Sequence, residues 1–136
     1  MNMSVKVENR PINRFGVLGK FNELTRNIMF TINTDSGFNN NRLVEASIQT
    51  LIQELVNARK NIKLFNSETT YNEESYERRK FYQDLFNDNL EWISAFFTML
   101  AQLRVNDDSD PKDFGVILNL ITEIQKMLKS LKRTDE

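Results

Sequence analysis

Few residues in this chain would interrupt a helix. The 136 residues include only four glycines and two prolines, and Pro11 and Pro111 both stand where a helical segment could begin. Proline is tolerated mainly at a helix start, because it lacks a backbone N–H and clashes with the preceding turn. The long stretches without such residues favour an all-α fold, and the length suits a single domain.

Apolar residues recur at three- and four-residue intervals in the first half of the chain. Over residues 14–33 they predict one helix with a single apolar face, formed by Val17, Phe21, Leu24, Ile28 and Ile32. Residues 34–41 are rich in turn-forming and N-capping side chains, so a second helix is expected over 41–64. Its main stripe is Val44, Ile48, Leu51, Leu55, Ala58 and Ile62, widened by Ile52 and Val56.

The third predicted helix, over residues 73–104, has apolar residues on two neighbouring faces. The first face carries Phe86, Leu90, Ile93, Phe97 and Leu100. The second, rotated by roughly 100°, carries Phe81, Leu85, Trp92, Phe96, Met99 and Leu103. Together they exceed what one core-facing stripe requires, so the helix is either central in the bundle or packed against a neighbouring subunit. We assign the second face as a candidate oligomer interface.

A fourth helix is predicted over residues 111–132. Asp110 suits an N-cap, Pro111 suits the first helical position, and Asp113 lies near the positive end of the helix dipole. Residues 1–13 hold few apolar side chains and are predicted to be a flexible arm, so the bundle should span 14–133. Short connections make successive helices antiparallel neighbours, so we predict an up-down-up-down four-helix bundle that forms an oligomer.

The chain has no cysteine and no histidine. Thiolate nucleophiles, imidazole bases, disulfides and the usual ligands of zinc, copper and haem are therefore missing. We predict a protein with no enzymatic activity, no metal site and no cofactor. Cysteine absence suits the reducing cytoplasm, the first residues lack the apolar core of a signal peptide, and no apolar run approaches the ~20 residues that cross a bilayer.

The predicted topology gathers positive charge at one end of the bundle, although the formal net charge is only −1. The starts of the first and third helices and the ends of the second and fourth meet there. The candidate nucleic-acid-binding residues are Arg14, Arg59, Lys60, Lys63, Arg78, Arg79, Lys80, Lys126, Lys129, Lys132 and Arg133. Tyr71, Tyr76 and Tyr82 are candidate stacking partners for bases.

Helix dipoles and local ion pairs could also account for these charges. Lysines near helix C-termini and acids near N-termini suit the helix dipole, and Glu73, Glu74 and Glu77 could neutralise the basic run over residues 78–80. No RNA- or DNA-binding motif is present, so the basic end could equally meet an acidic protein surface. Trp92 fits a core or interface position better than a binding hot spot.

Three stretches resemble the four-helix bundle family that includes the accessory variability determinant of diversity-generating retroelements and proteins encoded in ribosomal-RNA intervening sequences. They are NRLVEASIQTLIQELVNARK (41–60), LEWISAFFTMLAQL (90–103) and LNLITEIQKMLKSL (118–131), where Gln125 stands in place of a family glycine. The resemblance implies a barrel-shaped pentamer with a basic surface. It also implies binding to a reverse transcriptase and to RNA or DNA.

Two functions are therefore expected from the sequence. The first is a non-enzymatic accessory protein that binds reverse transcriptase and nucleic acid through its basic surface, as the resemblance implies. The alternative is a helical adaptor or inhibitor, encoded by a phage or mobile element, that docks on another protein without nucleic acid. Salt-dependent nucleic-acid binding separates the two.

Overall fold

The structure of the protein is a computed structural model, which describes the backbone of residues 2–38, 42–104 and 110–135 and the side chains of residues 16–38, 42–104 and 110–131. Its helices are α1 (Asn2–Thr34), α2 (Arg42–Ser67), α3 (Glu73–Leu103) and α4 (Phe114–Asp135), with a short 3₁₀-helix, η1 (Ser36–Phe38), after α1. The described residues contain no strand. The prediction of an all-α chain with four helices is confirmed.

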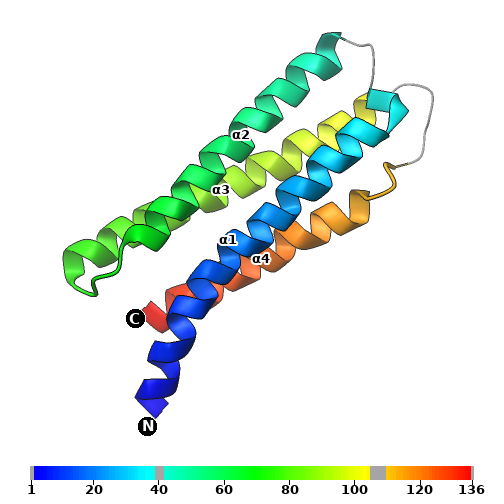
Figure 1. Ribbon diagram of the computed structural model, residues 1–136. Helices are drawn as coiled ribbons and strands as arrows, with labels where there is room; N and C mark the ends of the chain where they lie inside the picture. The colour runs from blue at the N-terminus through cyan, green and yellow to red at the C-terminus, as the bar shows by residue number, and fades with distance from the viewer. Residues whose placement is uncertain (1, 39–41, 105–109, 136) are drawn as a thin grey trace.

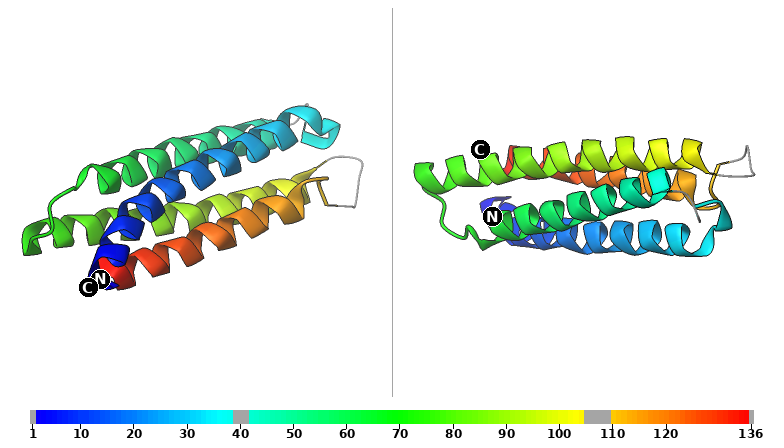
Figure 2. Two further views of the ribbon diagram at one scale, coloured as in Figure 1. Left: turned by 60° about the horizontal axis from the view of Figure 1, so that its bottom comes forward. Right: turned by 90° about the horizontal axis from the view of Figure 1, so that it is seen from above.

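The four helices lie side by side along one long axis (Figures 1 and 2). The start of α1, the end of α4 and the α2–α3 connection lie at one end of the bundle, which we call the hairpin end. The end of α1, the start of α2, the end of α3 and the start of α4 lie at the other. The most extensive contacts join α2 to α3 and α1 to α4, so the bundle consists of two closely packed helix pairs.

One continuous apolar core holds the pairs together. Its largest fully buried side chains include Phe21, Phe65, Phe86, Phe97, Leu24, Ile28, Leu51, Ile62, Leu90, Ile93, Leu100 and Ile117. The Phe21 and Phe86 rings meet edge to face with centroids 5.4 Å apart, which joins α1 to α3. The main core stripes predicted for the first three helices are confirmed, except that Ile48 is only partly buried against the core. Burial of each large side chain stabilises the fold by about 1.5–3 kcal/mol.

Two helix starts differ from the sequence prediction. α1 begins at Asn2, so residues 2–13 belong to this helix and not to a separate arm. Backbone hydrogen bonds within a helix are local and do not require the apolar periodicity on which the predicted start at residue 14 rested. The side chains of residues 1–15 lie outside the described part of the chain.

The second difference concerns α4, which begins at Phe114 and not at Pro111. The Phe114 N–H donates to the Pro111 carbonyl at 3.0 Å, which closes a turn before the helix. The Asp113 carbonyl then accepts the first helical bond, from the Ile117 N–H at 3.0 Å, so Asp113 occupies the N-cap position predicted for Asp110. Pro111 is buried at this turn. Because proline has no backbone N–H, its burial there leaves no donor without a partner.

The end opposite the hairpin end is closed by an ion pair between distant segments. Asp35 accepts from the Gly37 N–H at 2.8 Å and pairs with Arg104 at 2.6 Å, and both charged side chains are largely shielded from solvent. The Arg104 guanidinium lies 5.7 Å from the centre of the buried Phe38 ring. This contact fixes the turn after α1 against the end of α3.

Candidate functional site

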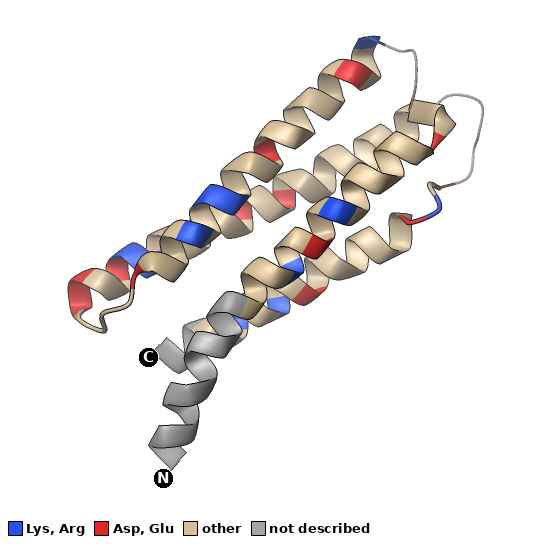
Figure 3. Cartoon of the chain, in the orientation of Figure 1, with Lys and Arg blue, Asp and Glu red and all other residues tan. Residues whose placement is uncertain are grey.

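The predicted basic surface is partly present. Figure 3 shows positive charge on α2 and α4 and at the start of α3, with acidic residues interspersed. The candidate residues whose side chains are exposed are Arg59, Lys60, Lys63, Lys80, Lys126 and Lys129. The side chains of Arg14, Lys132 and Arg133 lie outside the described part of the chain. The exposed candidates come from three different helices.

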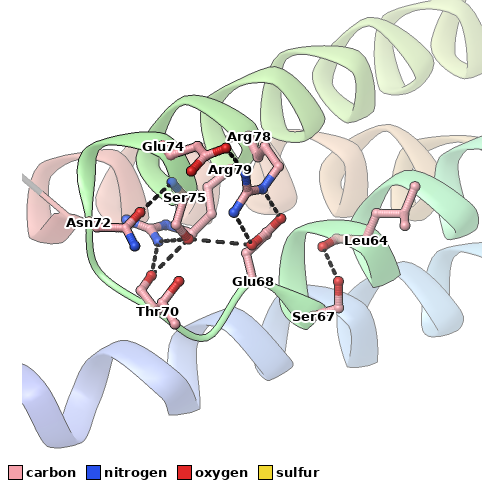
Figure 4. A network of polar contacts seen from close by, with 9 residues as sticks. All are labelled: Leu64, Ser67, Glu68, Thr70, Asn72, Glu74, Ser75, Arg78 and Arg79. Atoms are coloured by element: carbon pink, nitrogen blue, oxygen red, sulfur yellow. Dashed lines mark hydrogen bonds and ion pairs between the residues drawn. The ribbon is translucent and has the colours of Figure 1, made fainter.

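Arg79 does not belong to this exposed surface. Its side chain is 2% exposed. The guanidinium donates to the Thr70 carbonyl at 2.6 Å and to the Ser75 hydroxyl at 3.0 Å (Figure 4). It also lies 4.8 Å from the centre of the Tyr71 ring. The side chain therefore holds the α2–α3 connection in place. This burial argues against the prediction of Arg79 as a nucleic-acid-binding residue.

Arg78 is engaged in ion pairs at the same end. It donates to Glu68 through two guanidinium nitrogens and lies 3.3 Å from Glu74, as Figure 4 shows. The hydrogen bond from Arg78 lowers the pKa of Glu68 below its ordinary value despite partial desolvation, and the same contact raises the pKa of Arg78. Sequence reasoning expected Glu74 as a partner but missed Glu68, which lies ten residues away across the turn.

A long groove runs between α1 and α2. Its wider part has a volume of about 530 Å³ and is lined by Phe21, Asn22, Thr25, Arg26, Met29, Ile52, Leu55, Val56 and Arg59. A second hollow of about 510 Å³ continues along α2 and is lined by Val56, Arg59, Lys60, Lys63, Leu64 and Ser67. Because the two share Val56 and Arg59, we treat them as one feature, the α1–α2 groove.

The α1–α2 groove combines an apolar floor with a positive rim. Val56 is 57% exposed although it lies in the middle of α2, because α1 and α2 pack less closely than the α2–α3 and α1–α4 pairs. The rim carries Arg26, Arg59, Lys60 and Lys63, all exposed, and no aspartate or glutamate belongs to the lining that the structure describes. The widened stripe at Ile52 and Val56 was the sequence signal for this groove.

Glu54, which lies two residues before Val56 in α2, turns away from the groove. Its carboxylate accepts from the Asn89 amide of α3 at 2.7 Å, and Asn61 of α2 donates to the same Asn89 at 2.7 Å. These bonds tie α2 to α3 on the face opposite the groove. Glu54 is therefore held away from the cations at the rim, and their positive potential is retained.

The second apolar stripe of α3 divides into exposed and packed residues. Phe81 and Trp92 are 59% and 57% exposed, and Met99 is also exposed. Leu85 is partly buried, and Phe96 and Leu103 are partly buried against the core. The Trp92 and Phe96 rings pack with centroids 5.7 Å apart. Half of the predicted interface residues thus remain available at the surface.

Other classes of site find little support in the described residues. Within the described ranges, no group of three or more histidine, cysteine, aspartate or glutamate residues is placed to hold a metal ion. No described helix is both long enough and apolar enough to cross a membrane.

Comparison with known proteins finds no relative of this chain. The chain matches no family model, and no curated protein and no solved structure is significantly similar to it. The family resemblance therefore stays a prediction.

Proposed function

We propose that this protein is a non-enzymatic adaptor, built as an antiparallel up-down-up-down bundle, that binds an acidic amphipathic helix of another protein in its α1–α2 groove. The observation that supports this proposal is the groove itself, which pairs an apolar floor at Met29, Ile52 and Val56 with a rim of four cations. A helix that lays its apolar face into such a groove is a recurring mode of peptide recognition.

The two parts of the groove contribute different properties. The apolar floor gives affinity, because each Å² of apolar surface removed from water contributes about 25 cal/mol before the cost of association. The cations at Arg26, Arg59, Lys60 and Lys63 give specificity and a faster encounter with an acidic partner, and they disfavour a basic one. The proposal therefore names an acidic helix and not any apolar helix.

The test uses a fluorescently labelled, acidic amphipathic helical peptide and a second peptide in which each acid is replaced by lysine. Fluorescence anisotropy should show saturable binding of the acidic peptide only. Reversal of two rim charges, Arg59→Glu with Lys63→Glu, should weaken binding by about tenfold or more. Lys126→Glu with Lys129→Glu is the matched control, because these exposed lysines lie outside the groove lining. Equal binding of both peptides would contradict the proposal.

A second candidate function is the accessory role implied by the family resemblance, in which a pentamer binds reverse transcriptase together with RNA or DNA. The observation in its favour is the set of exposed cations on three helices, of which Lys80, Lys126 and Lys129 lie outside the groove lining. The pairing of Arg78 with acids and the burial of Arg79 weaken it, because both guanidinium groups are engaged by partners within the protein.

Nucleic-acid binding is tested with labelled single-stranded RNA at several salt concentrations. If the second candidate is correct, the logarithm of the binding constant should fall linearly with the logarithm of the salt concentration. The triple reversal of Lys80, Lys126 and Lys129 to glutamate should then abolish retention, with Arg79 left intact to preserve the fold. Absence of binding at low salt would leave only the protein-docking function.

A further inference from the structure

The α3 helix of this chain itself has the chemistry that the α1–α2 groove is proposed to bind. From Phe81 to Leu103 the sequence contains no lysine and no arginine. Asp84, Asp88 and Glu91 are exposed on this helix, beside the exposed rings of Phe81 and Trp92. We call this acidic and aromatic surface, with Met99, the α3 ridge.

The α3 ridge cannot reach the groove of its own chain. The α2 residues Glu54 and Asn61 bond to Asn89 of α3, which places α3 against that side of α2. Each residue of an α-helix is rotated by roughly 100° from the one before it. The groove residues Val56 and Lys63 therefore lie on the side of α2 about 180° away from Glu54 and Asn61. The ridge and the groove therefore belong to different faces of a closely packed bundle, and a ridge that fills the groove must come from another molecule.

The charges on the two surfaces have matching spacing. Asp84 and Asp88 are four residues apart on α3, and Arg59 and Lys63 are four residues apart on α2. In each pair the separation along the helix axis is about 6 Å. Two helices packed side by side could thus pair both acids with both cations, while Trp92 or Phe81 covers the apolar floor. Each aromatic side chain can bury about 150–250 Å².

We propose that the α3 ridge of one copy of this chain docks in the α1–α2 groove of a second copy. The proposal rests on the proposed function, since it names the occupant of the same groove. The contact joins two different surfaces, so each copy keeps one ridge and one groove available for further copies, and the assembly either closes into a ring or grows as a chain. An acidic helix from another protein would compete with the ridge.

The test begins with two variants, each altered on one surface. The groove variant carries Arg59→Glu and Lys63→Glu, and the ridge variant carries Asp84→Lys and Asp88→Lys. Light scattering should show that the unaltered protein gains mass with concentration, whereas each variant alone stays monomeric because like charges now face each other. An equimolar mixture should assemble again, since each variant supplies the partner for the other. Lys126→Glu with Lys129→Glu should assemble like the unaltered protein.

A contact between two α3 ridges would give a different pattern. The groove variant, whose ridge is intact, would then assemble like the unaltered protein; this outcome would overturn the proposal. Circular dichroism verifies that every variant keeps its helix content.

Fluorescence gives a second measurement, because Trp92 is the only tryptophan and is exposed in the single chain. Its emission should shift to shorter wavelength as concentration rises, and the groove variant, in which Trp92 itself is intact, should lose this shift.

The peptide and assembly experiments together distinguish the two proposals. If the acidic peptide binds the groove while the unaltered protein stays monomeric at every concentration, the self-docking proposal fails and the proposed function stands. If the peptide does not bind but the mixture assembles, the proposed function fails and the self-docking contact stands.

Discussion

At the scale of single residues, Arg79 shows that a charged side chain predicted to lie on the surface can instead stabilise the fold. It is buried, and it joins the Thr70 carbonyl to the Ser75 hydroxyl. Arg79→Met should lower the free energy of unfolding by about 2–4 kcal/mol, because the buried Ser75 hydroxyl and the Thr70 carbonyl lose a charged donor. Chemical denaturation measures the loss, and Lys80→Met, at an exposed neighbour, should change the free energy by no more than about 0.5 kcal/mol. Equal effects would show that the burial of Arg79 is unimportant.

The Glu68–Arg78 pair should make stability depend on pH. The pKa of Glu68 is lowered in the folded protein, so the carboxylate contributes stability above its ordinary pKa of 4.5 and loses that contribution as pH falls through the folded value. The difference in unfolding free energy between the unaltered protein and Glu68→Gln should therefore be largest near neutral pH. It should shrink in the acid range below 4.5.

Denaturation curves collected across that pH range measure this difference. Glu77→Gln, which removes an exposed acid from the same helix as Arg78, controls for the change in net charge. A difference that stays constant with pH would show that the Arg78 contact does not stabilise the folded state.

At the scale of helices, the two faces of α3 should respond differently to truncation. Phe86 is fully buried and meets Phe21 edge to face, whereas Phe81 is largely exposed. Phe86→Ala should cost about 3–5 kcal/mol of unfolding free energy, because it leaves a cavity in the core. Phe81→Ala, measured in dilute protein, should cost no more than about 0.5 kcal/mol. A large loss for Phe81→Ala would mean that the ridge serves the fold of the single chain.

The helices and their core faces could be predicted because both depend on local periodicity. Val17, Leu51 and Ile93 are buried as the apolar spacing indicated. The start of α4 could not be predicted, since Asp110 and Asp113 are both acceptable N-caps and the turn through Pro111 decides between them.

The candidate site was less predictable than the fold. The groove depends on how far α1 and α2 lie apart, and no local pattern encodes that distance. The burial of Arg79 depends on the path of the α2–α3 connection around it. Contacts of this kind depend on tertiary packing. From the sequence alone, the basic run over residues 78–80 is therefore equally compatible with a solvent-exposed surface and with a cluster that stabilises the fold.

At the scale of the whole molecule, the two ends of the bundle are fastened by separate polar contacts. Arg79 fastens the hairpin end, and the Arg104–Asp35 pair fastens the other, roughly 37 Å away along α3. Both act on the same continuous core. Changes at distant sites that share no partner add when a protein unfolds as one unit.

The double variant Arg79→Met with Arg104→Met tests that cooperativity. Arg104→Met alone should cost about 3 kcal/mol, because it leaves the shielded Asp35 carboxylate without its cation. The double variant should lose the sum of the two single losses to within about 0.5 kcal/mol, in one denaturation transition. Two separate transitions would instead show that the α2–α3 and α1–α4 pairs unfold independently. The groove between α1 and α2 would then lie at a boundary that opens, and a docked helix would stabilise the protein by bridging it.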